Sequence, residues 1–436
     1  MKPYIRMSVI ALLAAGLSLT SCDDTPNAFE LTDGVPTIKF VRTTDPAAAD
    51  SLITGAFLDK TICLVGENLT SIREMYFNDQ KAILNTSLIT DNTMVVDVPG
   101  NIPTDVTNKI YMTTKNGSRV EYPFQVKVPS PSVVSLSNEY AHAGDLVTIT
   151  GNYFIDDPNV PLTITMPGGI KVPSENITAL SQSQLSFIIP EGAEEGRIYV
   201  STIYGEGRSN FCYLDSRGML FDFDGKTGLD FAGNCWHGHT AQSDEWSISG
   251  NYVQLGDPDT TMDETGGWND NAYALEYWPG SWDLGLNSFP TEGQGMLLND
   301  LVNFSDYENM CLKFEMCVPS ANPWSAGAMQ LIFAPYSAVQ ITAANNTFFH
   351  ESPDMLPRAL YRPWQTTGSY DTADQWVTVT VPFSAFAFTF EGTPSGGSLT
   401  PDHFASLTIF VVSGGLNGTE CQPVIKIDNI RAVPLK

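Results

Sequence analysis

The chain repeats itself between residue 35 and about residue 215, and this repeat restricts the folds that it can adopt. Residues 63–69 match residues 148–154: each segment reaches a Gly, which is followed within two residues by Asn and then by an apolar residue. Residues 91–100 match 181–192, and residues 109–113 match 197–201. The matched segments lie about 90 residues apart, so two modules of one kind follow each other.

The sequence pattern of each module predicts an all-β sandwich. Short runs of alternating apolar and polar residues are interrupted by Gly, Asn, Asp or Pro about every 8–12 residues, which is typical of such sandwiches. Pro129 and Pro131 separate a first module (35–129) from a second module (130–215), and the restricted φ of proline predicts a stiff joint. The repeated motifs resemble the IPT/TIG immunoglobulin-like fold. Neither module contains Trp, so both are interpreted as spacers.

Residues 216–436 are predicted to form a C-terminal domain, because Gly, Asn, Asp and Trp become frequent there and the segments between the predicted strands are longer. In residues 377–381 the valines occupy one face and the threonines the other, which is the pattern of a half-buried antiparallel strand. Further strands are predicted near residues 219–223, 251–255, 311–318, 328–333, 407–412 and 424–433. This number of strands fits a single jelly-roll-like β-sandwich. The predicted fold class of the whole chain is therefore all-β.

The N-terminus carries the features of a targeting segment. Lys2 and Arg6 precede an apolar run at residues 7–19, which is too short for a comfortable membrane span. Residues 19–22 (Leu-Thr-Ser-Cys) resemble a bacterial lipobox, so residues 1–22 are predicted to be a lipoprotein signal peptide with Cys22 lipidated. Residues 23–34 would be a tether. Asp23 and Asp24 resemble the export signal of surface lipoproteins of Bacteroides-type bacteria, which implies a lipid-anchored protein at the outer-membrane surface.

Composition excludes some ligand classes. The formal net charge is −27, and only 16% of residues are charged. Nucleic acid and anionic lipid both require clustered Lys and Arg, so they are not expected partners, whereas neutral ligands are compatible. The six cysteines after Cys22 show no regular spacing, and their pairing stays open.

Aromatic residues supply the candidate binding site. All eight tryptophans follow residue 215, and Trp324, Tyr361 and Trp364 lie among turn-forming residues. We expect these three rings to be partly exposed and to stack on sugar rings; the alternative is that they cap the ends of the sandwich. Trp278 and Trp282 could extend the platform. Gln330 and Arg362 are assigned hydrogen bonds to sugar hydroxyls, and the alternative for Arg362 is a surface salt bridge. Core positions are assigned to Trp236, Trp246 and Trp376.

Four segments carry a family resemblance: residues 221–225, 324–330, 361–364 and 427–431. They resemble the C-terminal domain of surface glycan-binding proteins, which are outer-membrane lipoproteins encoded in polysaccharide utilisation loci. The best-known members bind xyloglucan and carry tandem immunoglobulin-like modules. The resemblance implies non-catalytic capture of a neutral polysaccharide, either xyloglucan or another β-glucan or β-mannan. It also implies uptake through a neighbouring transporter complex of the same locus.

Two other classes of protein remain open, and the sequence also offers candidate metal ligands. A glycoside hydrolase needs two apposed carboxylates, and no motif presents such a pair. A protein-binding adhesin would leave the clustering of the tryptophans unexplained. No cofactor is expected to be required, but a structural Ca²⁺ could be held between the first and last strands of the C-terminal domain by Asp222, Asp224 and Asp428.

Overall fold

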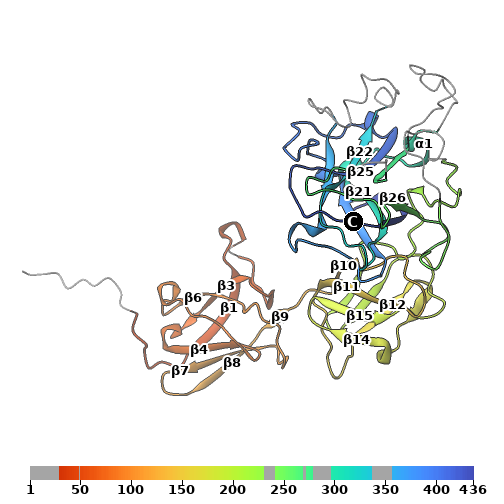
Figure 1. Ribbon diagram of the computed structural model, residues 1–436. Helices are drawn as coiled ribbons and strands as arrows, with labels where there is room; N and C mark the ends of the chain where they lie inside the picture. The colour runs from red at the N-terminus through yellow and green to blue at the C-terminus, as the bar shows by residue number, and fades with distance from the viewer. Residues whose placement is uncertain (1–28, 49, 230–240, 269–271, 278–295, 336–355) are drawn as a thin grey trace, which may run out of the picture. The chain divides into compact units, whose positions relative to one another are not determined.

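The computed structural model shows an almost entirely β protein, which confirms the predicted fold class. It divides into two compact units, Met1–Pro129 and Ser130–Lys436. In the described residues the α-helical content is the short α1 (Leu298–Leu301). The structure describes residues 29–48, 50–229, 241–268, 272–277, 296–335 and 356–436 (Figure 1).

The first module contains two antiparallel sheets and a short parallel pair. One sheet has the order β1-β3-β6, the other β5-β4-β7-β8, and β2 pairs with β9. The strands are β1 (Thr37–Thr43), β2 (Gly55–Phe57), β3 (Thr61–Glu67), β4 (Ile72–Phe77), β5 (Gln80–Lys81), β6 (Thr93–Asp97), β7 (Lys109–Thr114), β8 (Arg119–Pro123) and β9 (Gln125–Lys127).

The second module repeats this arrangement. Its two sheets have the orders β10-β11-β15-β14 and β13-β12-β16-β17. The strands are β10 (Ser132–Leu136), β11 (Leu146–Asn152), β12 (Thr163–Met166), β13 (Ile170–Lys171), β14 (Ile177–Leu180), β15 (Gln184–Ile188), β16 (Tyr199–Thr202) and β17 (Gly205–Arg208). The three repeated segments found in the sequence lie on β3, β6 and β7 in one module and on β11, β15 and β16 in the other.

Close packing of the backbone explains the repeated glycine. A Cβ atom on Gly66 would lie 1.9 Å from the carbonyl oxygen of Thr37, and one on Gly151 would lie 1.9 Å from that of Ser132. In both modules the neighbouring first strand carries a register shift close to this contact. Because β-bulges of this kind bring backbones close together, only glycine fits at these two positions.

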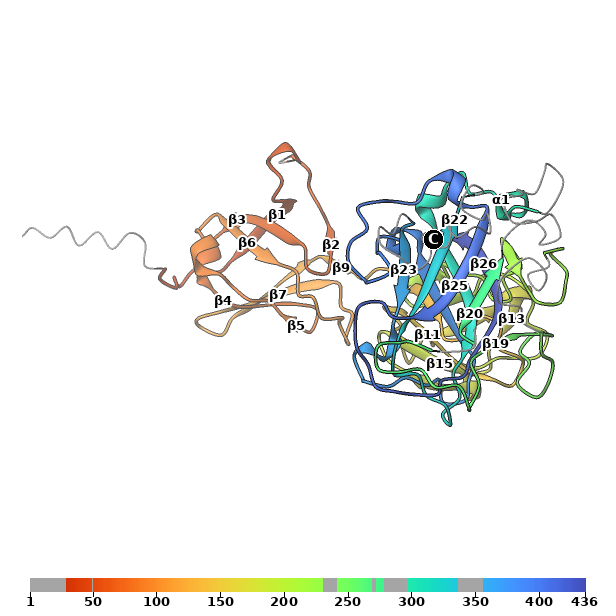
Figure 2. The same cartoon turned by 45° about the horizontal axis from the view of Figure 1, so that its top comes forward.

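The C-terminal domain is a sandwich of two antiparallel sheets. The first sheet has the order β18-β26-β21-β24, with β19 also paired to β26. The second sheet has the order β20-β25-β22-β23 (Figure 2). The strands are β18 (Met219–Phe221), β19 (Val253–Leu255), β20 (Ala274–Tyr277), β21 (Met310–Cys317), β22 (Ala328–Ala334), β23 (Arg358–Tyr361), β24 (Val377–Pro382), β25 (Ser406–Val412) and β26 (Ile425–Pro434).

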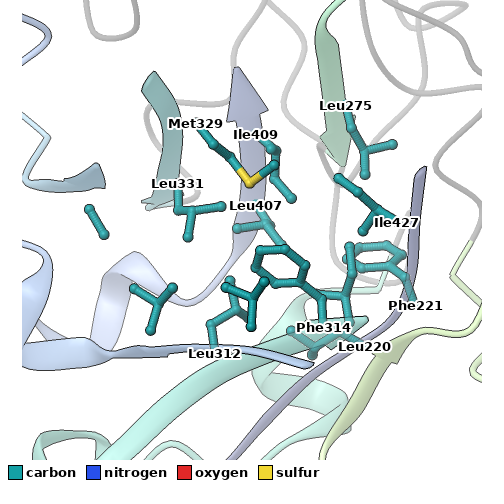
Figure 3. Close-up of a cluster of buried hydrophobic side chains, with 14 of the residues drawn as sticks. Leu220, Phe221, Leu275, Leu312, Phe314, Met329, Leu331, Leu407, Ile409 and Ile427 are labelled. Carbon is teal, nitrogen blue, oxygen red and sulfur yellow. The ribbon is translucent and has the colours of Figure 1, made fainter. Parts of the chain in front are cut away.

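The main hydrophobic core lies between these two sheets (Figure 3). Leu312 and Phe314 of β21 face Leu331 of β22 and Ile409 of β25, and all four are fully buried. These residues alternate along their strands with residues that point to the outer faces, as the pleat requires. The two outer faces of the sandwich therefore hold the remaining side chains of the same strands.

Among the described cysteines none forms a disulfide. The free thiols are Cys63, Cys212, Cys311, Cys317 and Cys421.

A buried ionic network joins the second module to the first sheet. Glu139 of the module accepts hydrogen bonds from Lys313 on β21 and, at 2.7 Å, from Nη2 of Arg431 on β26. Nη1 of Arg431 also lies 2.7 Å from the carboxylate of Glu315. The backbone N–H of Glu139 donates to Thr378 Oγ1 at 2.7 Å. None of these four charged residues is more than 7% exposed.

This network gives the second module a structural role beyond that of a spacer. Lys313, Glu315 and Arg431 point to the outer face of the first sheet, where a charged side chain is ordinarily solvated. In this chain they are buried, and they are neutralised by one another and by Glu139. A buried charge without a partner is strongly destabilising, so the sheet requires the module that supplies the second carboxylate.

We predict that Glu139→Ala destabilises unit Ser130–Lys436 by about 3–5 kcal/mol, because it leaves Lys313 and Arg431 buried with one carboxylate between them. Chemical denaturation followed by tryptophan fluorescence measures this change, since all tryptophans lie in that unit. Glu206→Ala, which removes an exposed glutamate of the same module, should leave the midpoint unchanged. Equal midpoints for both variants would contradict the role given to the network.

Candidate functional site

Trp324 and Trp364 are core residues, so the prediction that they form an exposed stacking platform is wrong. Trp324 is fully buried and Trp364 is 4% exposed. The indole N–H of Trp324 donates to the carbonyl of Ala326 at 2.6 Å, and that of Trp364 donates to the carbonyl of Gly327 at 2.8 Å. Both rings therefore fix the corner that leads into β22. The alternative considered for the sequence, that they cap the sandwich, is the correct one.

Tyr361 is partly exposed, as expected, and belongs to the same corner, while its stacking on sugar stays a prediction. It is the register partner of Met329, whose side chain points into the core. Its ring lies 6.2 Å from that of Trp324, and burial raises the pKa of its hydroxyl, which hydrogen-bonds with Tyr370. The side chain thus packs toward the core rather than toward the outer face of the second sheet.

The corner supports a tight turn that presents another tryptophan, Trp268. The Asp263 carboxylate accepts from the backbone N–H groups of Thr265 at 2.9 Å and Gly267 at 2.8 Å. Gly266 has φ +81°, and a Cβ there would lie 2.6 Å from the Cα of Gly327. Since Gly327 is the residue that Trp364 holds, the buried tryptophans position the turn that ends at Trp268.

Trp268 is partly exposed at the outer face of the second sheet. Its indole N–H donates to the carbonyl of Val411 on β25 at 2.7 Å. Its ring meets Tyr273 edge-on at 5.7 Å and packs against the small apolar cluster on this outer face. That cluster consists of Ala274, Ile332, Ala334, Leu356 and Phe410. Trp268 is therefore held rigidly while part of its surface remains accessible.

Gln330 lies in the middle of this outer face and is fully buried. Its amide N–H groups donate to the carbonyls of Phe390 at 3.1 Å and Val412 at 2.9 Å, and its oxygen accepts from Arg358 at 2.7 Å. Both the nitrogen and the oxygen of the Gln330 amide are hydrogen-bonded inside the protein. Two of these bonds hold the backbone of Phe390 and Val412, which are partly exposed. Gln330 does not itself face solvent, contrary to the direct contact expected from the sequence.

Arg362 lies beyond the end of β23 and is partly exposed. Its Nη1 is buried without a hydrogen-bond partner among the described residues, and burial lowers the pKa of the guanidinium. If Gly392 carried a Cβ atom, that atom would lie 3.4 Å from Nη2 of Arg362. The guanidinium is therefore beside the loop that carries Phe390. The predicted role of Arg362, hydrogen bonding to sugar hydroxyl groups, stays a prediction.

We use the name Trp268 surface for Trp268, Arg362, Phe390 and Val412. Neither Trp268 nor Phe390 is among the site residues predicted from the sequence. The signal for Trp268 was present in the preceding Asp-Glu-Thr-Gly-Gly, a turn sequence that ends in an aromatic residue. Trp278, Trp282 and Trp236 lie outside the described residues, so their predicted roles are not tested.

Trp246 and Trp376 are partly exposed, so the prediction that they are core residues is wrong. Neither is a member of the two clusters that the described residues of the C-terminal domain form. Trp376 lies directly before β24, where the sequence pattern of the strand suggested burial. Both indoles lie at the outer face of the first sheet.

The three carboxylates considered for calcium lie near the pairing of β18 with β26, the first and last strands of the domain. Asp222 accepts from the backbone of Asp224, Asp224 contacts Lys226 Nζ at 3.0 Å, and Asp428 accepts from Ser249 at 2.8 Å. Burial raises the pKa of Asp428 to about 8. In the described part of the chain no three acidic, His or Cys side chains are arranged to hold a metal. Calcium binding stays a prediction.

Comparison with known proteins gives consistent matches. The family model described as "Surface glycan-binding protein B xyloglucan binding domain" matches residues 213–434. The solved structure of surface glycan-binding protein PbSGBP-B from Prevotella bryantii is 43% identical, with a TM-score of 0.82, and the match covers 93% of this chain and 100% of that one. An IPT/TIG domain-containing protein of Bacteroides ovatus is 29% identical over 169 residues, 37% of this chain and 33% of the relative's length. The match thus spans about a third of that relative.

We predict that Trp324→Ala lowers the free energy of unfolding by about 3–5 kcal/mol, because a fully buried indole leaves a large cavity and frees the corner before β22. The melting temperature, followed by circular dichroism, measures this loss. Trp376→Ala is a matched control at a partly exposed position and should cost clearly less. A Trp324→Ala variant that melts like the unmodified chain would show that the ring is not part of the core.

Proposed function

The chain belongs to the family of surface glycan-binding proteins, and we propose that its C-terminal domain captures a neutral polysaccharide at the Trp268 surface. The observation that carries this proposal is the match of the family's binding domain to residues 213–434, which contain the whole surface. Binding of a carbohydrate at the cell surface follows from membership of the family. The ligand and the residues that contact it are the proposed part.

The chemistry of the Trp268 surface suits an uncharged sugar chain. A rigid indole offers an apolar ring face, and aromatic contacts contribute about 0.5–1.5 kcal/mol beyond the burial of area. The Phe390 ring is a second partly exposed aromatic, and Arg358 lies 5.8 Å from its centroid. Arg362 and backbone groups of the neighbouring loops could hydrogen-bond hydroxyl groups. A few polar groups beside apolar surface are sufficient to orient a ligand.

Xyloglucan is the first ligand that we propose, with other β-glucans and β-mannans as the next candidates. The family description names xyloglucan for the domain that matches this chain. The net charge of −27 is compatible with a neutral chain and unfavourable for an acidic polysaccharide.

The protein is not an enzyme, because the family consists of non-catalytic binding proteins. We propose that it retains polysaccharide at the cell surface and delivers it to a neighbouring transporter complex encoded in the same locus. The hydrolase and adhesin alternatives lose their support with the family assignment.

We further propose that the chain is held at the outer membrane by acyl chains on Cys22. The support is the order of charged residues, apolar run and lipobox-like Leu-Thr-Ser-Cys at the N-terminus. More than one acyl chain gives stable anchoring without a spanning helix. The helices within the described residues are all too short or too polar to span a bilayer.

We predict that Trp268→Ala weakens xyloglucan binding about tenfold, which corresponds to the loss of roughly 1.4 kcal/mol of stacking. Affinity electrophoresis in gels that contain xyloglucan, mixed-linkage β-glucan, glucomannan or starch measures the change and identifies the ligand. Trp268→Phe retains a ring and should lose less. Retention of full affinity by a folded Trp268→Ala variant would rule out this surface as the binding site.

We predict that Cys22→Ala releases the protein from the outer membrane, because the acyl chains can no longer be attached. Cell fractionation and surface labelling with an antibody measure the distribution. Asp23→Asn with Asp24→Asn should leave acylation intact but reduce surface labelling. A Cys22→Ala variant that still fractionates with the outer membrane would contradict the anchor.

A further inference from the structure

The outer face of the first sheet carries a second pair of partly exposed tryptophans. Lys426 of β26 is the register partner of Gln254 on one side and of Cys317 on the other. Trp376 directly precedes β24, whose first residue pairs with Met316. Trp376 therefore continues the outer-face row Gln254, Lys426 and Cys317. Trp246 lies over the same row, because its ring is 5.0 Å from the Lys426 ammonium.

Hydrogen bonds fix the two indoles relative to each other. The indole N–H of Trp376 donates to the carbonyl of Trp246 at 2.7 Å. The Trp376 ring meets the fully buried Tyr252 at 5.8 Å, edge-on. The Tyr252 hydroxyl lies 2.9 Å from the Asp244 carboxylate, which also accepts from the backbone N–H of Trp246 at 2.8 Å. Trp246 and Trp376 are thus pre-organised while they remain partly exposed.

Lys426 occupies the inner side of this pair. It is 5% exposed, and its ammonium lies 4.8 Å from the Tyr252 ring and donates to Gln254 at 2.9 Å. Burial lowers the pKa of this lysine. Because the cation contacts the Trp246 ring from within the protein, the accessible part of that indole is directed away from the sheet. Such cation–π contacts also hold the ring in place.

The surroundings favour an uncharged ligand with hydroxyl groups. Asp244, Glu245 and Asp374 are exposed next to the two indoles in the chain. Carboxylates accept hydrogen bonds from hydroxyl groups and repel anionic ligands. The other described tryptophans, at positions 268, 324 and 364, all pack against the hydrophobic clusters of the domain. Within the described residues, Trp246 and Trp376 are members of neither cluster, and their packed contacts are with Tyr252 and Lys426.

We propose that Trp246 and Trp376 form a second surface for a neutral glycan, on the opposite face of the sandwich from the Trp268 surface. This second surface and the Trp268 surface share only the class of ligand. The residues of the second surface lie at the outer face of the first sheet, and those of the Trp268 surface lie at the outer face of the second sheet. A protein with two such faces could hold two segments of polysaccharide at once, which increases avidity for a long chain without a stronger individual contact.

Fluorine NMR of the whole chain after Cys22, labelled with 5-fluorotryptophan, tests the proposal. Single Trp→Phe variants assign the signals. Oligosaccharides from xyloglucan, mixed-linkage β-glucan and mannan are the probes. We expect the Trp246 and Trp376 signals to shift together with one dissociation constant, and the Trp268 signal to shift with its own. The signals of the buried Trp324 and Trp364 are internal controls and should not move.

Variants make the two surfaces separable. Trp376→Ala should weaken the titration seen at Trp246 about tenfold and leave that seen at Trp268 unchanged. If the Trp246 and Trp376 signals stay fixed while Trp268 saturates, the second surface is overturned and the proposed function stands. If the pair shifts and Trp268 does not, the second surface stands and the Trp268 surface is wrong. If none of the three shifts with any probe, both are overturned.

Discussion

The buried ionic network around Arg431 is the constraint on which unit Ser130–Lys436 depends. Arg431, Lys313 and Glu315 project from the outer face of the first sheet, and Glu139 reaches them from the second module. These charges lose their hydration when they are buried, and only well-placed ion pairs between the module and the sheet compensate for that loss. Removing either partner leaves the other as an unpaired buried charge, which destabilises the fold. The position of the module is therefore set by charge pairing, which is directional, and not only by apolar contact. The outer face of the first sheet is consequently divided between a docked part and the part that carries Trp246 and Trp376.

A second constraint governs the aromatic residues of the C-terminal domain. Large rings at the open corner of a sandwich close the core, and their indole N–H groups must find acceptors when they are buried. Trp324 and Trp364 satisfy this need with the carbonyls of Ala326 and Gly327, and the corner that they fix supports the turn before Trp268. Buried tryptophans thus act on binding indirectly, by holding the accessible one in place.

Local sequence patterns predicted the architecture well and the site poorly. The repeat, the alternation of residues 377–381 and the turn residues are local signals, and the structure has the corresponding sandwiches. Exposure of a single ring is not a local property. Trp324 and Trp268 both lie among turn-forming residues, yet one is fully buried and the other is partly exposed. Trp376 directly precedes a regular strand, and this local pattern predicted a core position. In the structure the residue is partly exposed.

The sequence by itself determined the all-β class, the two similar modules, the family of the C-terminal domain and the glycine at the close contact of each module. The family follows from the resemblance of four short segments to known members, and the other three follow from periodicity, repetition or a backbone requirement that a short segment expresses. The tertiary structure alone decided which tryptophans reach the surface and which residues of distant strands neutralise one another. Both depend on contacts between segments far apart in sequence: Glu139, in the connection after β10, meets Arg431 across 292 positions of the chain. Burial and charge pairing are properties of that assembled surface, so no single segment encodes them.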